Sequence, residues 1–291
     1  MSEFIHLHNH THYSLLDAAC SVDALIKATK DNNMNSVALT DHGVTFGLME
    51  FYTKARKAGI KPILGCEVYM AVGSRFDKIA TNTKAKTRNY YHLILLAKDL
   101  EGYRNLCKLT SRAHTEGFYY KPRIDRQLLS ENYKGLVALS ACAGGVVSSH
   151  LIREEIDLAR EAIGWYKDVF KDDFYIEIQN HYLDVDKNIL HHAPILAKEF
   201  GLKIIATNDV HYIKKEHAVA HNVLLHIRDA SGKNALTGNE IETNLKYKTP
   251  EFYFKSVDEM KLMLGEFPDA FYSTLEVAEK CNYENSIRSE R

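Results

Sequence analysis

Residues 1–12 read MSEFIHLHNHTH, and His6, His8, His10 and His12 occupy alternate positions in this stretch. A β-strand sends alternate side chains to one face, and the apolar residues between the first histidines favour a strand. Neutral imidazole is the commonest protein ligand for zinc and similar metals. A polar edge strand or the remnant of a tag are the alternatives, but a tag would be an uninterrupted histidine run. The pattern therefore predicts a strand that ends in a metal site.

Further potential ligands follow short runs with β-strand character at 36–40, 61–65, 136–140 and 203–207. The residues at or just after these runs include Asp41, His42, Cys66, Glu67, Cys142, Asp209 and His211. His92 is an exception, because it precedes its apolar run. Parallel α/β barrels build their sites at the C-terminal ends of their strands. The pattern is typical of such a barrel.

Segments with helical periodicity alternate with these runs, which implies a mostly parallel sheet. We expect helices at 22–32, 45–58, 100–115, 154–170 and 185–200, with Ser21 as the first N-cap. Six or seven strand–helix repeats favour a barrel over a small open sheet. Residues 229–249 are polar and indicate a connector, and helices are predicted at 257–264 and 269–282. We accordingly divide the chain into a barrel domain, 1–228, and a connector with a helical segment, 229–291.

The composition is that of a water-soluble globular protein. Hydrophobic residues make up 45% of the 291 residues, the net charge is −1, and no apolar run approaches the length of a membrane span. The five cysteines are an odd number without a CxxC pair, which argues against a disulfide scaffold and for a reducing compartment, the cytoplasm. The net charge gives no evidence for nucleic-acid binding, so any DNA contact must come from local patches.

Two local basic patches are present. One is a polar stretch at 73–90, and the other, at 103–126, interleaves basic residues with aromatic ones such as Phe118, Tyr119 and Tyr120. Basic side chains neutralise phosphates and aromatic rings stack on unpaired bases. The alternative is a solvated helix face with a few core tyrosines.

Seven motifs resemble those of the PHP (polymerase and histidinol phosphatase) superfamily: HLHNH at 6–10, YSLLDA at 13–18, TDHG at 40–43, GCEVY at 65–69, YYHLILLA at 90–97, LSACAGG at 139–145 and TNDVHY at 207–212. The sequences of these motifs are most similar to those of the N-terminal PHP domain of bacterial replicative polymerase III alpha subunits. The segments EFYFKS at 251–256 and FPDA at 267–270 resemble the stretch that leads from PHP towards the polymerase palm. The resemblance covers nearly the whole chain. It implies a distorted (β/α)7 barrel with a short, mostly helical C-terminal extension.

The resemblance also implies a metal site with nine ligands, and every matching position here holds a residue that can bind metal. These are His8, His10, Asp17, His42, Glu67, His92, Cys142, Asp209 and His211. They would hold up to three divalent ions. The first would use His8, His10, Glu67 and Asp209; the second Glu67, His92 and Cys142; and the third Asp17, His42 and His211. The mixed ligand set suits zinc, with manganese or iron as alternatives. Glu67, Asp209 and His10 are expected to carry catalysis.

The implied function is a metal-dependent phosphoesterase, specifically a 3′–5′ proofreading exonuclease that hydrolyses terminal phosphodiesters of DNA with a metal-activated water. The chain has no room for palm, fingers and thumb, so we expect it to be a piece of a longer DNA-directed DNA polymerase. Its partners would be a DNA 3′ end, the remaining polymerase domains and other replisome subunits, and no membrane. The alternatives are a free-standing phosphatase acting on a small phosphomonoester, or a non-catalytic, metal-stabilised scaffold for the polymerase.

Individual positions have less specific interpretations. Cys142 could be a buried thiol, Asp17 a helix cap and His92 a core histidine. Asp41 and Asn208, which flank ligands, are expected to support those ligands or to lie in turns, and His6 and His12 are expected near the site without binding metal. The remaining histidines fit no ligand motif; His217, His221 and His226 have near-helical spacing and are interpreted as one face of a helix.

Overall fold

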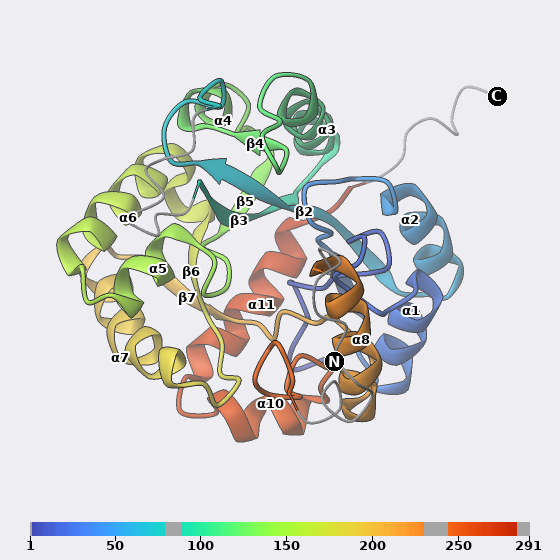
Figure 1. Ribbon diagram of the computed structural model, residues 1–291. Coiled ribbons are helices and arrows are strands. Elements are labelled where there is room, and N and C mark those ends of the chain that lie inside the picture. The colour runs from blue at the N-terminus through green and yellow to red at the C-terminus, as the bar shows by residue number, and fades with distance from the viewer. Residues whose placement is uncertain (1, 79–88, 230–243, 284–291) are drawn as a thin grey trace.

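The structure is a computed structural model that describes residues 2–78, 89–229 and 244–283 (Figure 1). Its centre is a seven-stranded sheet in the order β1-β2-β3-β5-β6-β7, with β4 paired to β2 outside this path. The strands are β1 Ser36–Leu39, β2 Lys61–Ala71, β3 Tyr90–Ala97, β4 Arg123–Ile124, β5 Leu136–Leu139, β6 Phe174–Ile178 and β7 Lys203–Ala206. All pairings are parallel except those of β3, which runs antiparallel to both β2 and β5. The reversed strand distorts the predicted parallel barrel.

The N-terminal segment joins the two edges of this sheet. On one side, the carbonyl oxygens of His6 and Asn9 accept hydrogen bonds from the β1 edge, namely from Ala38 N at 2.9 Å and Thr40 N at 3.0 Å. On the other side, His10 N donates to Val210 O at 2.8 Å. The segment thus closes the curled sheet into a barrel.

The predicted N-terminal strand, residues 4–8, is wrong. The structure has no regular strand there, and the only β-type pairing of this described segment is an isolated parallel bridge between Asn9 and Val210. The reason lies in Asn9. Its side-chain amide donates to His6 O and Ala38 O, at 3.0 and 2.9 Å, so that Ala38 O is bonded to a side chain where a regular ladder would pair it with a backbone N–H of this segment. The segment is still extended and still directs His8 and His10 to one place.

Helices surround the sheet (Figure 1). They are α1 Val22–Asp31, α2 Leu48–Lys57, α3 Leu100–Thr115, α4 Arg126–Glu131, α5 Val146–Ile152, α6 Ile156–Phe170, α7 Asp184–Glu199, α8 Ala218–Asp229, α10 Val257–Leu264 and α11 Pro268–Lys280, with 3-10 turns at Lys171–Asp173 and Lys215–His217. Ser21 caps α1 as predicted, by accepting a hydrogen bond from Ala24 N. The seven predicted helices are confirmed with end shifts of up to three residues, and α8 contains His221 and His226 of the expected helix face. The short α4 and α5 were not predicted.

Alternate residues of the strands enter two separate cores, as the two-residue period of a strand requires. Leu93 and Leu95 of β3 pack outward against the helices, and Ile94 and Leu96 pack into the barrel interior. The inner core includes Val277, Ala278 and Cys281, from α11 and its C-cap. Figure 1 shows α11 crossing the middle of the ring of outer helices. This helix fills the end of the barrel opposite the strand C-termini.

The helix α11 therefore packs on the barrel, where Thr274 Oγ1 accepts a hydrogen bond from Ile5 N. The division at residue 228 stays a prediction. No helix in the three described ranges is long and apolar enough to cross a membrane.

Candidate metal centre

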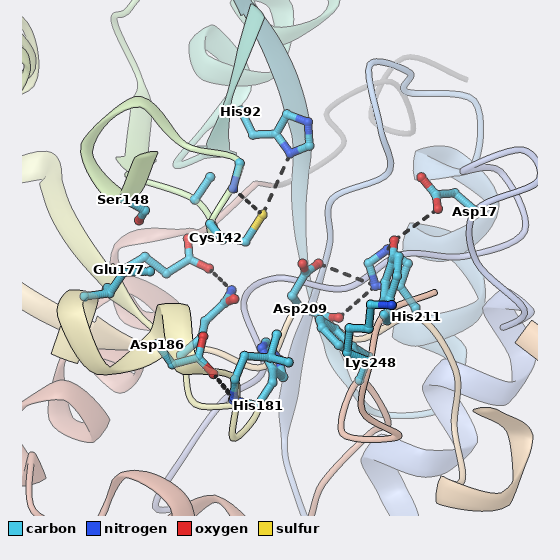
Figure 2. Close-up of a pocket in the computed structure, with 18 of the residues that line it drawn as sticks. Asp17, His92, Cys142, Ser148, Glu177, His181, Asp186, Asp209, His211 and Lys248 are labelled. Carbon is cyan, nitrogen blue, oxygen red and sulfur yellow. Dashed lines mark hydrogen bonds and ion pairs between the residues drawn. The ribbon is translucent and has the colours of Figure 1, made fainter. Parts of the chain in front are cut away.

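The nine predicted ligands come together at the end of the barrel formed by the strand C-termini. Six of them line a cavity of about 480 Å³: Asp17, His42, His92, Cys142, Asp209 and His211. The other three, His8, His10 and Glu67, are fully buried beside it. Figure 2 shows His92 and Cys142 on one wall, Asp17 and His211 on the opposite wall, and Asp209 between them.

The first predicted group is compact. Nε2 of His8 and Nε2 of His10 lie 3.1 Å apart, and Asp209 Oδ1 lies 3.1 and 3.2 Å from them. These three ligand atoms can surround one cation. Glu67 is farther away, with its oxygens 3.5 Å from His8 and 3.4 Å from His10.

Glu67 lies between the groups, as expected of a bridging carboxylate. Its Oε1 is 2.9 Å from Nδ1 of His92, and its Oε2 is 2.5 Å from Nδ1 of His42. Cys142 Sγ lies 3.8 Å from His92 Nδ1 and 3.9 Å from Glu67 Oε1. The thiol of Cys142 therefore faces the other members of the second predicted group.

The third predicted group, Asp17, His42 and His211, is more open. Asp17 Oδ2 is 3.2 Å from Nε2 of His42, and the rings of His42 and His211 have centroids 5.8 Å apart. His42 also stacks on His10 at 4.0 Å, so that the histidines of the three groups form one continuous cluster.

In this buried cluster, burial and neighbouring charges shift the pKa values of the carboxyl groups in opposite directions. Burial disfavours the charged form of Glu67, but His92, His42 and His8 hold its pKa well below the usual range. The same opposition holds for Asp209, whose pKa is lowered by His8 and His211. Burial and the positive charge of His42 lower the pKa of His10 to about 3. The neutral His10 imidazole is the form that binds metal.

Three buried ligand atoms of the cluster have no hydrogen-bond partner among the described residues. They are His42 Nδ1, Glu67 Oε2 and Asp209 Oδ1, and each is free to coordinate a cation. The first two lie close together but outside hydrogen-bond geometry. Buried polar groups without partners cost free energy, and coordination to a divalent ion is one way to satisfy them. Imidazole, carboxylate and thiolate together suit a transition metal such as zinc.

The sequence analysis missed Glu177. Its Oε1 accepts a hydrogen bond from His8 Nδ1 at 2.7 Å and another from Gln179 Nε2 at 2.8 Å, and it also contacts the Thr207 hydroxyl. The strand-like alternation of residues in Phe174–Ile178 could have revealed it, because this alternation places Glu177 on the same inward face as Tyr175. Such a carboxylate orients the ring of a metal ligand.

Tyr247 was missed as well. Its hydroxyl is 3.2 Å from Asp17 Oδ1 and 3.3 Å from His211 Nε2, and the side chain lines the cavity. No local pattern could have revealed this contact, because Tyr247 follows a long polar connector and is 230 residues from Asp17.

His221 lies on α8, which agrees with its interpretation as part of a helix face. It is also buried: its ring is tilted against that of His211, with centroids 5.5 Å apart, and its Nε2 contacts Asp17 O at 2.7 Å. Asp41 accepts hydrogen bonds from Thr11 and Ser14, and Ser14 Oγ also contacts His10 Nδ1, which fits the expected supporting role rather than a turn. His6 is buried with Nε2 donating to Lys255 O, and His12 is exposed beside Tyr13.

Two basic residues of the predicted patches are buried and bonded within the protein. Arg75 is buried and pairs with Asp125 and Glu116, and Arg123 is buried with its guanidinium on backbone carbonyls. Lys84, Lys86 and Arg88 lie outside the described residues.

The fold and site together are those of a curled α/β barrel with a candidate metal centre of imidazoles and carboxylates at its strand C-termini. Residues 6–181 match the family model of the PHP domain, and the chain belongs to that family. It is 41% identical to DNA polymerase III subunit alpha of Chlamydia trachomatis, over 97% of this chain and 24% of the relative. The corresponding proteins of Borreliella burgdorferi and Thermus aquaticus are each 43% identical, over 97% and 98% of this chain. The chain spans about a quarter of the length of these relatives, 24, 24 and 23%.

Among solved structures, a candidate metal-dependent phosphoesterase from Bifidobacterium adolescentis aligns with a TM-score of 0.45 and 13% identity, over 71% of this chain and 87% of that one. A two-domain protein from Bacteroides vulgatus with a predicted PHP-like metal-dependent phosphoesterase aligns with a TM-score of 0.41 and 16% identity, over 72% of this chain and 52% of that one.

Proposed function

We propose that this chain is the metal-dependent phosphoesterase part of a replicative DNA polymerase alpha chain, and that it removes terminal nucleotides from DNA 3′ ends by hydrolysis. The observation that carries the proposal is the convergence of all nine ligand-type side chains on one cavity. The similarity to polymerase alpha chains over 97% of this chain points to DNA as the substrate. The domain would act in the cytoplasm beside the other polymerase domains and replisome subunits.

The nine side chains would hold up to three divalent ions, preferably zinc, in the three groups described above. Such ions activate water and neutralise the charge of a phosphodiester. The protein itself contributes orientation: Glu177 holds the proton on His8 Nδ1, which leaves Nε2 directed at Asp209. Lys248 and Lys246 line the same cavity and add positive charge for a phosphate group, although Lys246 is also paired with Asp229.

The test is stepwise shortening of a 3′-mismatched primer-template by the purified, metal-loaded chain. The control is a His8→Ala/Asp209→Ala double variant, which loses two ligand atoms of the first group. We expect shortening by the wild type alone. A small chromogenic phosphomonoester is tested in parallel, because preferential turnover of that substrate would instead favour a free-standing phosphatase.

Two results would contradict the proposal. Equal shortening by both proteins would place the activity elsewhere or in a contaminant. Absence of shortening while metal remains bound, with unfolding on metal removal, would point to the metal-stabilised scaffold.

A further inference from the structure

The turn at residues 117–122 lies against the His42 side of the metal centre. It leads into β4, which pairs in parallel with β2 through Tyr69 and Arg123 (Figure 1). Pro122 is so close to Gly43, the residue after His42, that a Cβ on Gly43 would lie 2.8 Å from Pro122 Cγ. The turn is therefore next to the cavity, although it contributes none of the nine ligands.

This turn is held firmly on the barrel. The buried guanidinium of Arg123 donates to Gly117 O at 3.1 Å and to Asp77 O at 2.8 Å. Gly117 approaches Arg123 so closely that a Cβ would lie 1.8 Å from Arg123 O. Lys78 Nζ donates to Phe118 O at 3.0 Å. A rigid base of this kind presents the side chains at the tip in fixed positions.

The tip carries a large apolar ring in solvent. Tyr120 is 75% exposed and adopts a φ of 58°, which is rare for a bulky residue. Its ring contacts the ring of Tyr119, with centroids 4.7 Å apart in an edge-on arrangement, and this leaves the outer face of Tyr120 available. Strained backbone of this kind is concentrated at functional sites.

The next residue, Lys121, connects the tip to the metal centre. Its Nζ lies over the ring of Tyr69 at 5.3 Å, and that ring is 5.3 Å from His92 and 6.1 Å from His42. Within the described part of the chain Lys121 pairs with no carboxylate. A positive charge is thus available between an exposed aromatic ring and two of the predicted ligands.

We propose that Tyr120 and Lys121 form a subsite for single-stranded DNA, in which an unpaired base stacks on Tyr120 and Lys121 neutralises the adjoining phosphate, so that the strand is directed into the cavity. This inference rests on the proposed function and names the form of its substrate. An aromatic platform next to a cation is the general means of binding single strands without sequence preference. The bases inside a duplex are already stacked on each other on both faces and could not use the Tyr120 face.

The test is fluorescence anisotropy with a labelled oligonucleotide of about ten nucleotides, within the usual range of single-strand sites, whose phosphorothioate linkages resist hydrolysis. Tyr120→Ala should weaken binding about tenfold, and Tyr120→Phe should restore it because stacking needs only the ring. Lys121→Ala should flatten the slope of log K against log salt by about 0.7. The matched control is Tyr272→Ala, since Tyr272 is 69% exposed on α11 and does not line the cavity.

The proposal is overturned if the wild type does not bind the oligonucleotide, if Tyr120→Ala binds it as tightly as the wild type, or if Tyr272→Ala loses affinity equally. It is also overturned if a duplex without single-stranded ends depends on Tyr120 to the same degree. The proposed reaction is measured separately: Tyr120-dependent binding without any end-trimming would contradict the reaction and support the subsite.

Discussion

Glu177 accepts a 2.7 Å hydrogen bond from Nδ1 of His8, and both side chains are fully or almost fully buried. This bond fixes the tautomer in which Nε2 of His8 is free to bind metal. Loss of such a partner typically weakens metal binding 10–100-fold. Glu177→Gln keeps the volume but removes the charge, so we expect its metal affinity to fall by about that range.

The affinity is measured by competition with a chelator at fixed pH. The matched control is Glu161→Gln, because the side chain of Glu161 is 68% exposed on α6. An affinity in Glu177→Gln equal to that of the wild type would show that His8 does not need this partner.

Cys142 should determine which metal the second group prefers. Its thiol faces His92 and Glu67, and thiolate favours zinc over manganese. Cys142→Ser is expected to lower zinc affinity about tenfold or more and to leave manganese affinity nearly unchanged. Competition titrations with zinc and with manganese measure the two affinities separately. A uniform loss for both metals would mean that the substitution disturbs the cavity rather than one ligand.

The sequence predicted the barrel and the convergence of the nine site residues well, because both depend on local periodicity and on short motifs at strand ends. Asp209 and His211, for instance, directly follow β7 and are read from one motif. It could not predict contacts between distant segments. Tyr247 reaches Asp17 across the barrel mouth, and the burial of Arg75 depends on Asp125, 50 residues away.

The role of α11 was equally hidden from the sequence. The sequence predicted a helix at 269–282, but nothing in it specified that Val277 would enter the barrel interior. Likewise, the alternating histidines predicted a strand, and only the side chain of Asn9 explains why the segment is extended without being a regular strand.

The role of α11 in filling one end of the barrel, here called the α11 plug, can be tested by placing a charge in the barrel interior. Val277 is fully buried among inward-facing strand residues, so Val277→Asp places an unpaired carboxylate in an apolar interior. We expect a loss of about 3 kcal/mol or more in the free energy of unfolding. Leu262→Asp is the control, since Leu262 is 83% exposed and should change stability by less than about 0.5 kcal/mol. Urea denaturation measures both, and equal effects would contradict the plug.

Glu276 should make stability depend on acidic pH. Burial alone would raise the pKa of Glu276, but contacts with Lys203, Tyr175 and Lys280 lower it from 4.5 to about 2. The folded state therefore binds this proton less readily than the unfolded state, and the stabilisation is complete above about pH 4.5 and lost as the pH falls towards 2. Because Glu276 is partly exposed, Glu276→Gln should cost only about 1 kcal/mol at pH 7.

The decisive measurement is the difference in urea unfolding free energy between wild type and Glu276→Gln as a function of pH. That difference should be constant from pH 7 to about 5 and should shrink steadily below pH 4.5, because protonation makes the wild-type side chain neutral as well. The matched control is Glu279→Gln, on the exposed face of the same helix. A difference that persists undiminished at pH 3 would mean that the charge of Glu276 does not stabilise the attachment of α11 to β6 and β7.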